Sequence, residues 1–183
     1  MTRGANNWYV LTGGPSTGKT TLLAALGAHG YVTAPEAARQ VIDEGLAKGL
    51  TVAQIRRDEA AFQQAIFALK MQLESQLSAA ALTFLDRGMH DSLAYFRYYS
   101  YKPTPEMDKA FHASRYRKVF LLEPLPVFDR DYARTETGDF ASRIQTLLFE
   151  AYAEYGMEPV TVPPVSVEQR VQFILQNAGQ QLP

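Results

Sequence analysis

One segment constrains the fold of this 183-residue chain more than any other: Gly13-Gly14-Pro15-Ser16-Thr17-Gly18-Lys19-Thr20. It follows a run of apolar, aromatic and β-branched residues, WYVLT, which predicts a buried strand. From Gly18 onward, leucines at helical spacing predict a helix that ends near residues 27–30. The segment matches G-x-x-x-x-G-K-[ST] in full, and it lies between a strand and a helix as that pattern requires. It therefore predicts a phosphate-binding loop (P-loop) in an α/β fold.

Each residue type in this loop has a physical role in holding ATP or GTP. Backbone N–H groups surround the β-phosphate, and the start of the following helix presents the positive end of its dipole. Lys19 is expected to reach the β and γ oxygens, and Thr20 to bind Mg²⁺. We assign nucleotide binding to Gly13, Gly14, Pro15, Ser16, Thr17, Gly18, Lys19, Thr20 and Thr21. A chance glycine-rich turn is the alternative, whereas a dinucleotide-binding turn gives the lysine and threonine no role.

Short apolar runs alternate with helical patterns along the rest of the chain. Further strands are predicted at residues 31–35, 81–85, 118–124 and 159–163. Helices are predicted after Pro35, from Thr51 to about Ser78, in two short pieces broken at Pro103 and Pro105, around 140–156 and after Ser166. Thr51 with Gln54, and Ser166 with Gln169, have capping-box spacing. The alternation predicts one domain, 1–183, with a three-layer α/β P-loop NTPase fold: a five-stranded, mostly parallel sheet with helices on both faces.

Charged residues follow the predicted strands at the edge where α/β sheets bind ligands. Asp86 is placed to hold Mg²⁺, and Arg87 to reach the transferred phosphoryl group or the acceptor. Glu36 is placed to accept a proton from an acceptor hydroxyl or to bind a sugar. The alternatives are that all three only end strands or begin helices. Asp91, one helical turn beyond Arg87, is either functional or a helix cap.

The polar stretch after the fourth predicted strand is a candidate lid, at about 127–139. Within it, Arg134 is expected to place its guanidinium on developing phosphoryl charge, and Arg130 is a weaker candidate. The alternative is a solvated loop with weak local ion pairs.

Two other groups of residues are not assigned a site. The three histidines, at positions 29, 90 and 112, lack metal-ligand spacing and are interpreted as surface or capping residues. The aromatic residues between 95 and 101 are able to stack a flat ring, but packing is the favoured interpretation.

Composition excludes several classes of protein. The formal net charge is -1, so nucleic acid is not an expected partner. The chain has no cysteine, which excludes disulfides and thiolate metal sites and favours a cytoplasmic location. No stretch approaches the roughly 20 apolar residues of a transmembrane helix, and no secretory signal is recognisable. Without an N-K-x-D segment, ATP is favoured over GTP, although GTP stays open.

Six blocks together resemble the NadR/Ttd-type AAA-like family of small P-loop proteins, which includes ribosylnicotinamide kinase domains. They are TGGPSTGKTTLL, APEAARQVI, FLDRGMHDSLAY, VFLLEPLP, DYARTE and EPVTVPPVSVEQRVQFIL, and they run almost end to end. The resemblance implies a fold like that of nucleoside and nucleotide kinases. It leaves the chemistry open, because other members resemble nucleotide-dependent regulators and one group binds a lipid together with GTP.

Two hypotheses follow. In the first, the chain is a kinase: Lys19, Asp86, Glu36, Arg87 and Arg134 act together to move the γ-phosphoryl of Mg·ATP to a small-molecule hydroxyl, such as that of a nucleoside. In the second, it is a nucleotide-dependent switch that presents a surface to a protein or lipid. A closed, polar-lined cavity bounded by Glu36 and Arg87 favours the kinase, and a filled one favours the switch.

Overall fold

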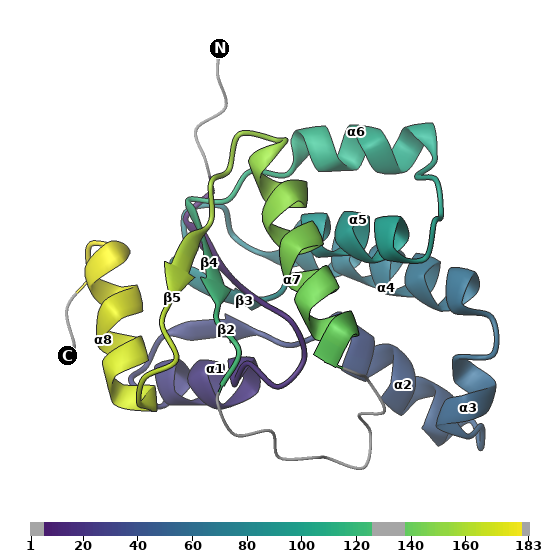
Figure 1. The fold of residues 1–183 in the computed structure, drawn as a ribbon. Coiled ribbons are helices and arrows are strands. Elements are labelled where there is room, and N and C mark those ends of the chain that lie inside the picture. The colour runs from purple at the N-terminus through teal and green to yellow at the C-terminus, as the bar shows by residue number, and fades with distance from the viewer. Residues whose placement is uncertain (1–5, 126–137, 181–183) are drawn as a thin grey trace.

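The fold is built on a five-stranded sheet in which every neighbouring pair of strands is parallel. The structure is a computed structural model that describes residues 6–125 and 138–180. The strands are β1 (Trp8–Thr12), β2 (Val32–Ala34), β3 (Thr83–Asp86), β4 (Lys118–Leu122) and β5 (Val160–Val162). Their order is β2-β3-β1-β4-β5, so β1 lies at the centre (Figure 1). The predicted three-layer α/β P-loop fold is confirmed.

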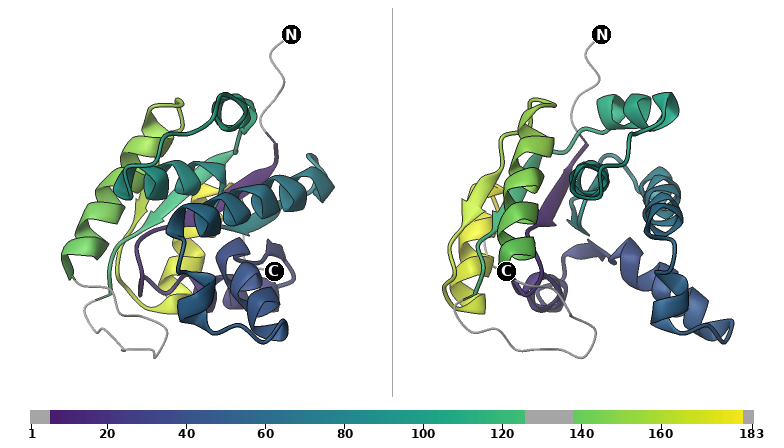
Figure 2. Two further views of the ribbon diagram at one scale, coloured as in Figure 1. Left: turned by 90° about the vertical axis from the view of Figure 1, so that its right-hand side faces the viewer. Right: turned by 45° about the vertical axis from the view of Figure 1, so that its right-hand side comes forward.

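Helices cover both faces of the sheet. They are α1 (Lys19–Ala28), α2 (Ala37–Ala47), α3 (Val52–Ile55), α4 (Glu59–Gln76), α5 (Met89–Tyr98), α6 (Pro105–Ala113), α7 (Gly138–Ala153) and α8 (Val167–Asn177). Helices α1 and α8 lie on one face, and α5 and α7 on the other (Figures 1 and 2). Helices α2, α3 and α4 form a group beside α5. No described helix is long and apolar enough to cross a membrane.

The strands at the centre of the sheet are buried because both faces of the sheet are covered. All five residues of β1 and all four of β3 are buried. On one face, Leu22 and Ile174 pack against the sheet in a single apolar cluster. On the other, Leu93 and Ile144 belong to a second cluster that joins α5 to α7. The helix predicted around 140–156 is therefore confirmed, although it already ends at Ala153.

The single long helix predicted from Thr51 to about Ser78 is wrong. The Thr51–Gln54 capping box does form, but it opens only the four-residue α3. A new helix begins after Asp58, whose side chain accepts a hydrogen bond from the N–H of Ala61 at 3.0 Å. Aspartate is a strong N-cap, so Asp58 starts a second helix after α3 has ended at Ile55. The second predicted capping box, at Ser166, is confirmed.

Glu74 of α4 gives a stability prediction. Its carboxyl accepts a hydrogen bond from the Tyr116 hydroxyl at 2.7 Å, yet burial raises its pKa to about 7. Because the folded pKa lies above the unfolded value, stability is lost as the pH rises between those two values. Glu74→Gln keeps the acceptor oxygen and removes the charge, so we expect it to raise the free energy of unfolding by about 1–2 kcal/mol at pH 8. At pH 4, urea unfolding should show no gain, and an equal gain at both pH values would contradict the assignment.

Candidate active site

The loop between β1 and α1 has a backbone that requires glycine at two positions. Gly13 has a φ of 146° and Gly18 a φ of 80°, both in the left-handed region that favours glycine. A Cβ at Gly13 would also lie 2.8 Å from the carbonyl oxygen of Leu122. Gly18 is the N-cap of α1 and, being glycine, makes no side-chain cap bond to that helix. The N–H groups at the start of α1 are thus left for an anion, as in a phosphate-binding loop.

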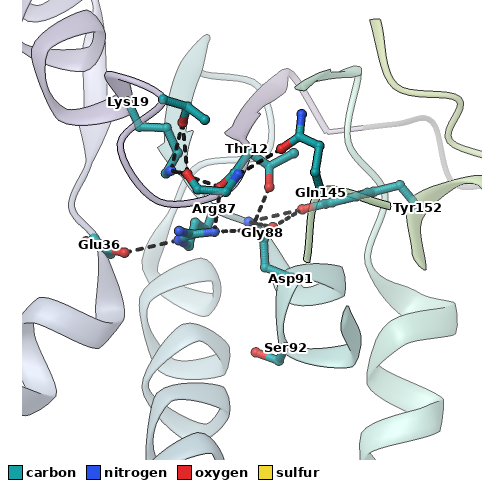
Figure 3. Close-up of polar contacts among 12 residues, drawn as sticks. Thr12, Lys19, Glu36, Arg87, Gly88, Asp91, Ser92, Gln145 and Tyr152 are labelled. Atoms are coloured by element: carbon teal, nitrogen blue, oxygen red, sulfur yellow. Dashed lines mark hydrogen bonds and ion pairs between the residues drawn. The ribbon is translucent and has the colours of Figure 1, made fainter. Parts of the chain in front are cut away.

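Lys19 lies inside this loop. Its Nζ donates to the carbonyl oxygens of Gly13 at 2.9 Å and Gly14 at 2.8 Å, and to Oγ1 of Thr17 at 3.1 Å (Figure 3). Burial first, and then the nearby charge of Arg87, lower its pKa to about 7 against the opposing effect of neighbouring carboxylates. An anion in the loop would add opposite charge and favour the ammonium form.

Arg87 joins the loop to two helices. It stands at the end of β3 with a positive φ of 69°. Its Nε donates to Glu36 at the start of α2 at 3.0 Å, and its Nη1 donates to Asp91 of α5 at 3.0 Å and to the carbonyl of Gly13 at 3.2 Å. Figure 3 shows the guanidinium between the two carboxylates. Burial alone would lower the pKa of Arg87, but Tyr95 and the carboxylates outweigh it and hold the pKa above its ordinary value.

Asp91 is fully buried and is both a cap and the centre of this network. Its carboxylate accepts from the hydroxyls of Thr12, at 2.7 Å, and Tyr152, and from the N–H of Gly88 at 3.0 Å. Burial would raise its pKa, but Lys70, Arg87 and these hydrogen bonds hold it below the usual range. The carboxylate is surrounded by protein donors, so Asp91 positions Arg87.

Asp86, at the end of β3, has a buried carboxylate oxygen, Oδ1, with no hydrogen-bond partner among the described residues. Burial raises its pKa to about 6, with repulsion from Glu36 adding to the rise and Arg87 and Lys19 opposing it. Such an orphaned oxygen beside a P-loop fits a divalent cation or the water bound to one. In the described part of the chain, no three His, Asp or Glu side chains gather as a metal site, so phosphate and water would supply most ligands beside Thr20 and Asp86.

A cavity of about 330 Å³ adjoins the loop. Residues 15–21 line one part of it, and Glu36 and Arg87 another. The remaining wall comes from α2–α5 and from the segment after β4: Ala38, Ile42, Arg56, Phe62, Gln63, Ile66, Lys70, Ser92, Tyr95 and Leu125. The predicted residues Lys19, Thr20, Thr21, Glu36 and Arg87 therefore share one cavity.

Three residues at the site were missed by sequence reasoning. Gln145 of α7 accepts from the N–H of Gly14 at 2.9 Å and donates to the carbonyl of Leu122 at 3.0 Å. Arg170 of α8 is buried and donates to the carbonyl of Thr17 at 2.8 Å. Lys70 is buried in α4. A signal existed for Lys70, because it lies four residues after Ile66 on a stripe that is otherwise apolar.

The expectation that His90 is a surface or capping residue is wrong. It is fully buried, with its ring 4.8 Å from that of Tyr155 and 5.1 Å from that of Tyr152, and burial lowers its pKa to about 4. Helix α5 packs against α4, α6 and α7, so this part of it has no solvent-facing side. Packing is the main use of the nearby aromatic residues, since Phe96 is buried, but Tyr95 also lines the cavity.

The predicted lid lies almost wholly outside the described residues. This applies to Arg134 and Arg130 and to all of 126–137. The last two residues of the predicted segment, 138 and 139, begin α7.

The central strand, the loop and the strand order define the class: a P-loop NTPase domain. A family described as the AAA domain matches residues 8–170, and the chain belongs to that family. The resemblance to the NadR/Ttd-type AAA-like group is thereby confirmed. We found no match among curated proteins.

Several solved structures share the fold. A NadR protein in complex with NR has a TM-score of 0.69 and 17% identity, over 96% of this chain and 50% of that one, so the chain spans about half the length of NadR. A deoxyadenosine kinase from M. mycoides has a TM-score of 0.67 and 14% identity, over 94% and 98% of the two chains. Thymidylate kinase from Candida albicans has a TM-score of 0.58 and 15% identity, over 97% and 93%. At these identities the likeness shows a nucleoside- and nucleotide-kinase-like fold.

Proposed function

We propose that this chain is a small-molecule kinase that transfers the γ-phosphoryl group of Mg·ATP to a hydroxyl of a nucleoside-like acceptor. The observation that carries the proposal is the cavity of about 330 Å³, which the P-loop shares with Glu36 and Arg87. Its volume falls within the roughly 300–1,000 Å³ typical of small-molecule sites. A kinase needs room for an acceptor beside the phosphates, whereas a switch has no such need.

The donor side is formed by the loop and the end of β3. The N–H groups of the loop would hold the β-phosphate. The ammonium of Lys19 would give up its hydrogen bonds to the loop carbonyl oxygens and donate to the β- and γ-phosphate oxygens instead. Thr20 and the orphaned oxygen of Asp86 would hold Mg²⁺, which when bound neutralises charge on the phosphate oxygens. Gln145 and Arg170 keep the loop in shape through the N–H of Gly14 and the carbonyl of Thr17.

The acceptor side is formed by Glu36 and Arg87. Burial would raise the pKa of Glu36, but Arg87 and Lys19 outweigh it and hold the pKa below its ordinary value, so the carboxylate stays ionised. An ionised carboxylate accepts a hydrogen bond from the attacking hydroxyl, and it takes up the proton as the new P–O bond forms and the bond from the γ-phosphorus to the bridging oxygen breaks, releasing ADP. Arg87 lies beside both the loop and Glu36, where it stabilises charge on the moving phosphoryl group. Arg134 stays a sequence-based candidate for the same role.

Transfer is tested with Mg·ATP and a panel of nucleosides, nicotinamide riboside and nucleoside monophosphates, with mass detection of new phosphorylated products. The kinase proposal expects one class of acceptor to gain a phosphoryl group, and Glu36→Gln to slow that transfer while ATP still binds. ATP binding without any product across the panel would favour the alternative, a nucleotide-dependent switch with a protein or lipid partner.

Asp86→Asn tests the assignment of the metal ligand. The substitution keeps the shape of the side chain and removes its charge, so we expect ATP binding to need several-fold more Mg²⁺. Calorimetric titrations of ATP at a series of Mg²⁺ concentrations would measure the shift, with Asp43→Asn on the exposed side of α2 as the matched control. An unchanged requirement for Mg²⁺ would mean that Asp86 ends β3 but does not bind the metal.

A further inference from the structure

Gln63 of α4 is a buried amide in the wall of the same cavity. The residue is 4% exposed, although glutamine is a residue type that usually stays at the surface. Its neighbours on α4, Phe62 and Ile66, also line the cavity, and they belong to an apolar cluster formed by α2, α3 and α4. None of residues 13–20, all of which the structure describes, belongs to that cluster. Gln63 therefore adds an uncharged polar group to a part of the wall that the helices build without the P-loop.

One hydrogen bond fixes the direction of the Gln63 amide. Its Nε2 donates to Oε1 of Glu59, one turn earlier on α4, at 2.9 Å. The carboxylate of Glu59 also pairs with Arg56 at 3.3 Å, and a carboxylate accepts hydrogen bonds without donating any. The NH₂ group of the amide therefore faces Glu59, and its carbonyl oxygen, Oε1, points the other way.

The carbonyl oxygen of Gln63 has no donor in the described part of the chain. Within residues 6–125 and 138–180, the bond to Glu59 is the one hydrogen bond of this amide. The side-chain atoms there that are both sealed and unpartnered belong to Asp86, His90 and Arg170. Oε1 of Gln63 is not among them, so it opens onto the cavity that the residue lines. An occupant that displaces water from this oxygen must offer it a donor or lose affinity.

The apolar wall beside this oxygen fits a flat ring. Glu36 is the N-cap of α2, and Ala38 and Ile42 of that helix line the cavity together with Phe62. A nucleoside whose hydroxyl lies at Glu36 would therefore lay its base along α2 and towards α4. The edge of that base would meet Oε1 of Gln63. Ionised carboxylates and phosphates have no donor for this oxygen, whereas amino and carboxamide groups donate an N–H.

We infer that Gln63 sets specificity for the acceptor by accepting a hydrogen bond from an amino or amide N–H of its base. The transfer step rests on the proposed function, but recognition of the base rests on the cavity wall. A base without an N–H donor leaves the buried carbonyl oxygen unpaired, and a base with a carboxylate brings a second acceptor against it. The P-loop and Glu36 carry the chemistry, and Gln63 selects the molecule that reaches them.

The test compares nucleosides that differ at a single group. Adenosine is paired with purine riboside and cytidine with zebularine, and in both pairs the second member lacks the amino group. Nicotinamide riboside is paired with nicotinic acid riboside, in which a carboxylate replaces the carboxamide. Calorimetry in the presence of Mg·ADP measures binding, and mass detection with Mg·ATP measures transfer. We expect the wild-type chain to bind the N–H donor of at least one pair on the order of 10- to 100-fold more tightly, the scale of leaving a buried acceptor unpaired.

Gln63→Met separates recognition from packing, because methionine has a similar length but no amide. The variant should lose the preference through weaker binding of the N–H donor alone. Gln64→Met is the matched control, since Gln64 is the adjacent glutamine on α4 and is exposed; it should keep the preference of the wild type.

Equal affinity of the wild-type chain within all three pairs would overturn the inference without any variant. Equal weakening of both members of the selective pair in Gln63→Met would also overturn it, because it would assign the residue a packing role. Selective binding without any transfer would uphold Gln63 and refute the kinase. Transfer without selectivity within the pairs would refute the role of Gln63 and leave the kinase standing.

Discussion

Replacing Lys19 by alanine should weaken ATP binding by on the order of 2–3 kcal/mol, about 30- to 150-fold in Kd. The ammonium lies inside the loop, within 3.1 Å of three loop oxygens. A bound phosphate would replace these oxygens as its hydrogen-bond partner. Removing the ammonium takes away a charge-assisted hydrogen bond to the β and γ oxygens. Burial disfavours the ammonium in the free protein, so the loss should fall on the nucleotide complex rather than on the fold.

The measurement is calorimetric titration of ATP and of AMP into the Lys19→Ala variant. The affinity loss should be large for ATP and small for AMP, which lacks the β and γ phosphates. Lys48→Ala, which removes an exposed lysine at the end of α2, should bind both nucleotides like the wild type. Unchanged ATP affinity in a folded Lys19→Ala protein would refute the assignment of the loop.

The fold was predictable because its signals are local. The P-loop pattern, the short apolar runs and the leucine spacing each lie within a few residues of sequence, and they place β1, α1 and all five strands to within a few residues. The break between α3 and α4 was missed although its signal was also local. Asp58 reads equally well as a polar surface residue of one helix or as the cap of a new one, and only packing decides between these.

The site was predictable only in part, because its connections span the chain. Glu36 and Arg87 were each expected at the edge of the sheet, but their ion pair joins residues 51 positions apart. Gln145 reaches the loop across 131 positions and Arg170 across 153, so neither has a nearby motif that marks it. Asp91 was left between a cap and a functional residue because its hydrogen bonds to Thr12 and Tyr152 span 79 and 61 positions of sequence.

Asp91→Ala should lower the free energy of unfolding by about 3–5 kcal/mol, the range for breaking a buried ion pair by removing one partner. The carboxylate is fully buried and compensates the charge of Arg87, whose side chain is 9% exposed. Its loss also leaves the hydroxyls of Thr12 and Tyr152 and the N–H of Gly88 without this acceptor.

Chemical unfolding of three variants would show whether the charge or the hydrogen bonds carry this effect. Asp91→Asn keeps an acceptor oxygen but not the charge, so it should fall between the wild type and Asp91→Ala. Tyr152→Phe removes one uncharged partner and should cost only about 1 kcal/mol. If Asp91→Ala lowered the free energy of unfolding by less than about 1 kcal/mol, Glu36 alone would compensate the charge of Arg87. The Arg87 guanidinium would then depend on an ion pair whose carboxylate is about a quarter exposed (26%), rather than on a buried network that holds it against the P-loop.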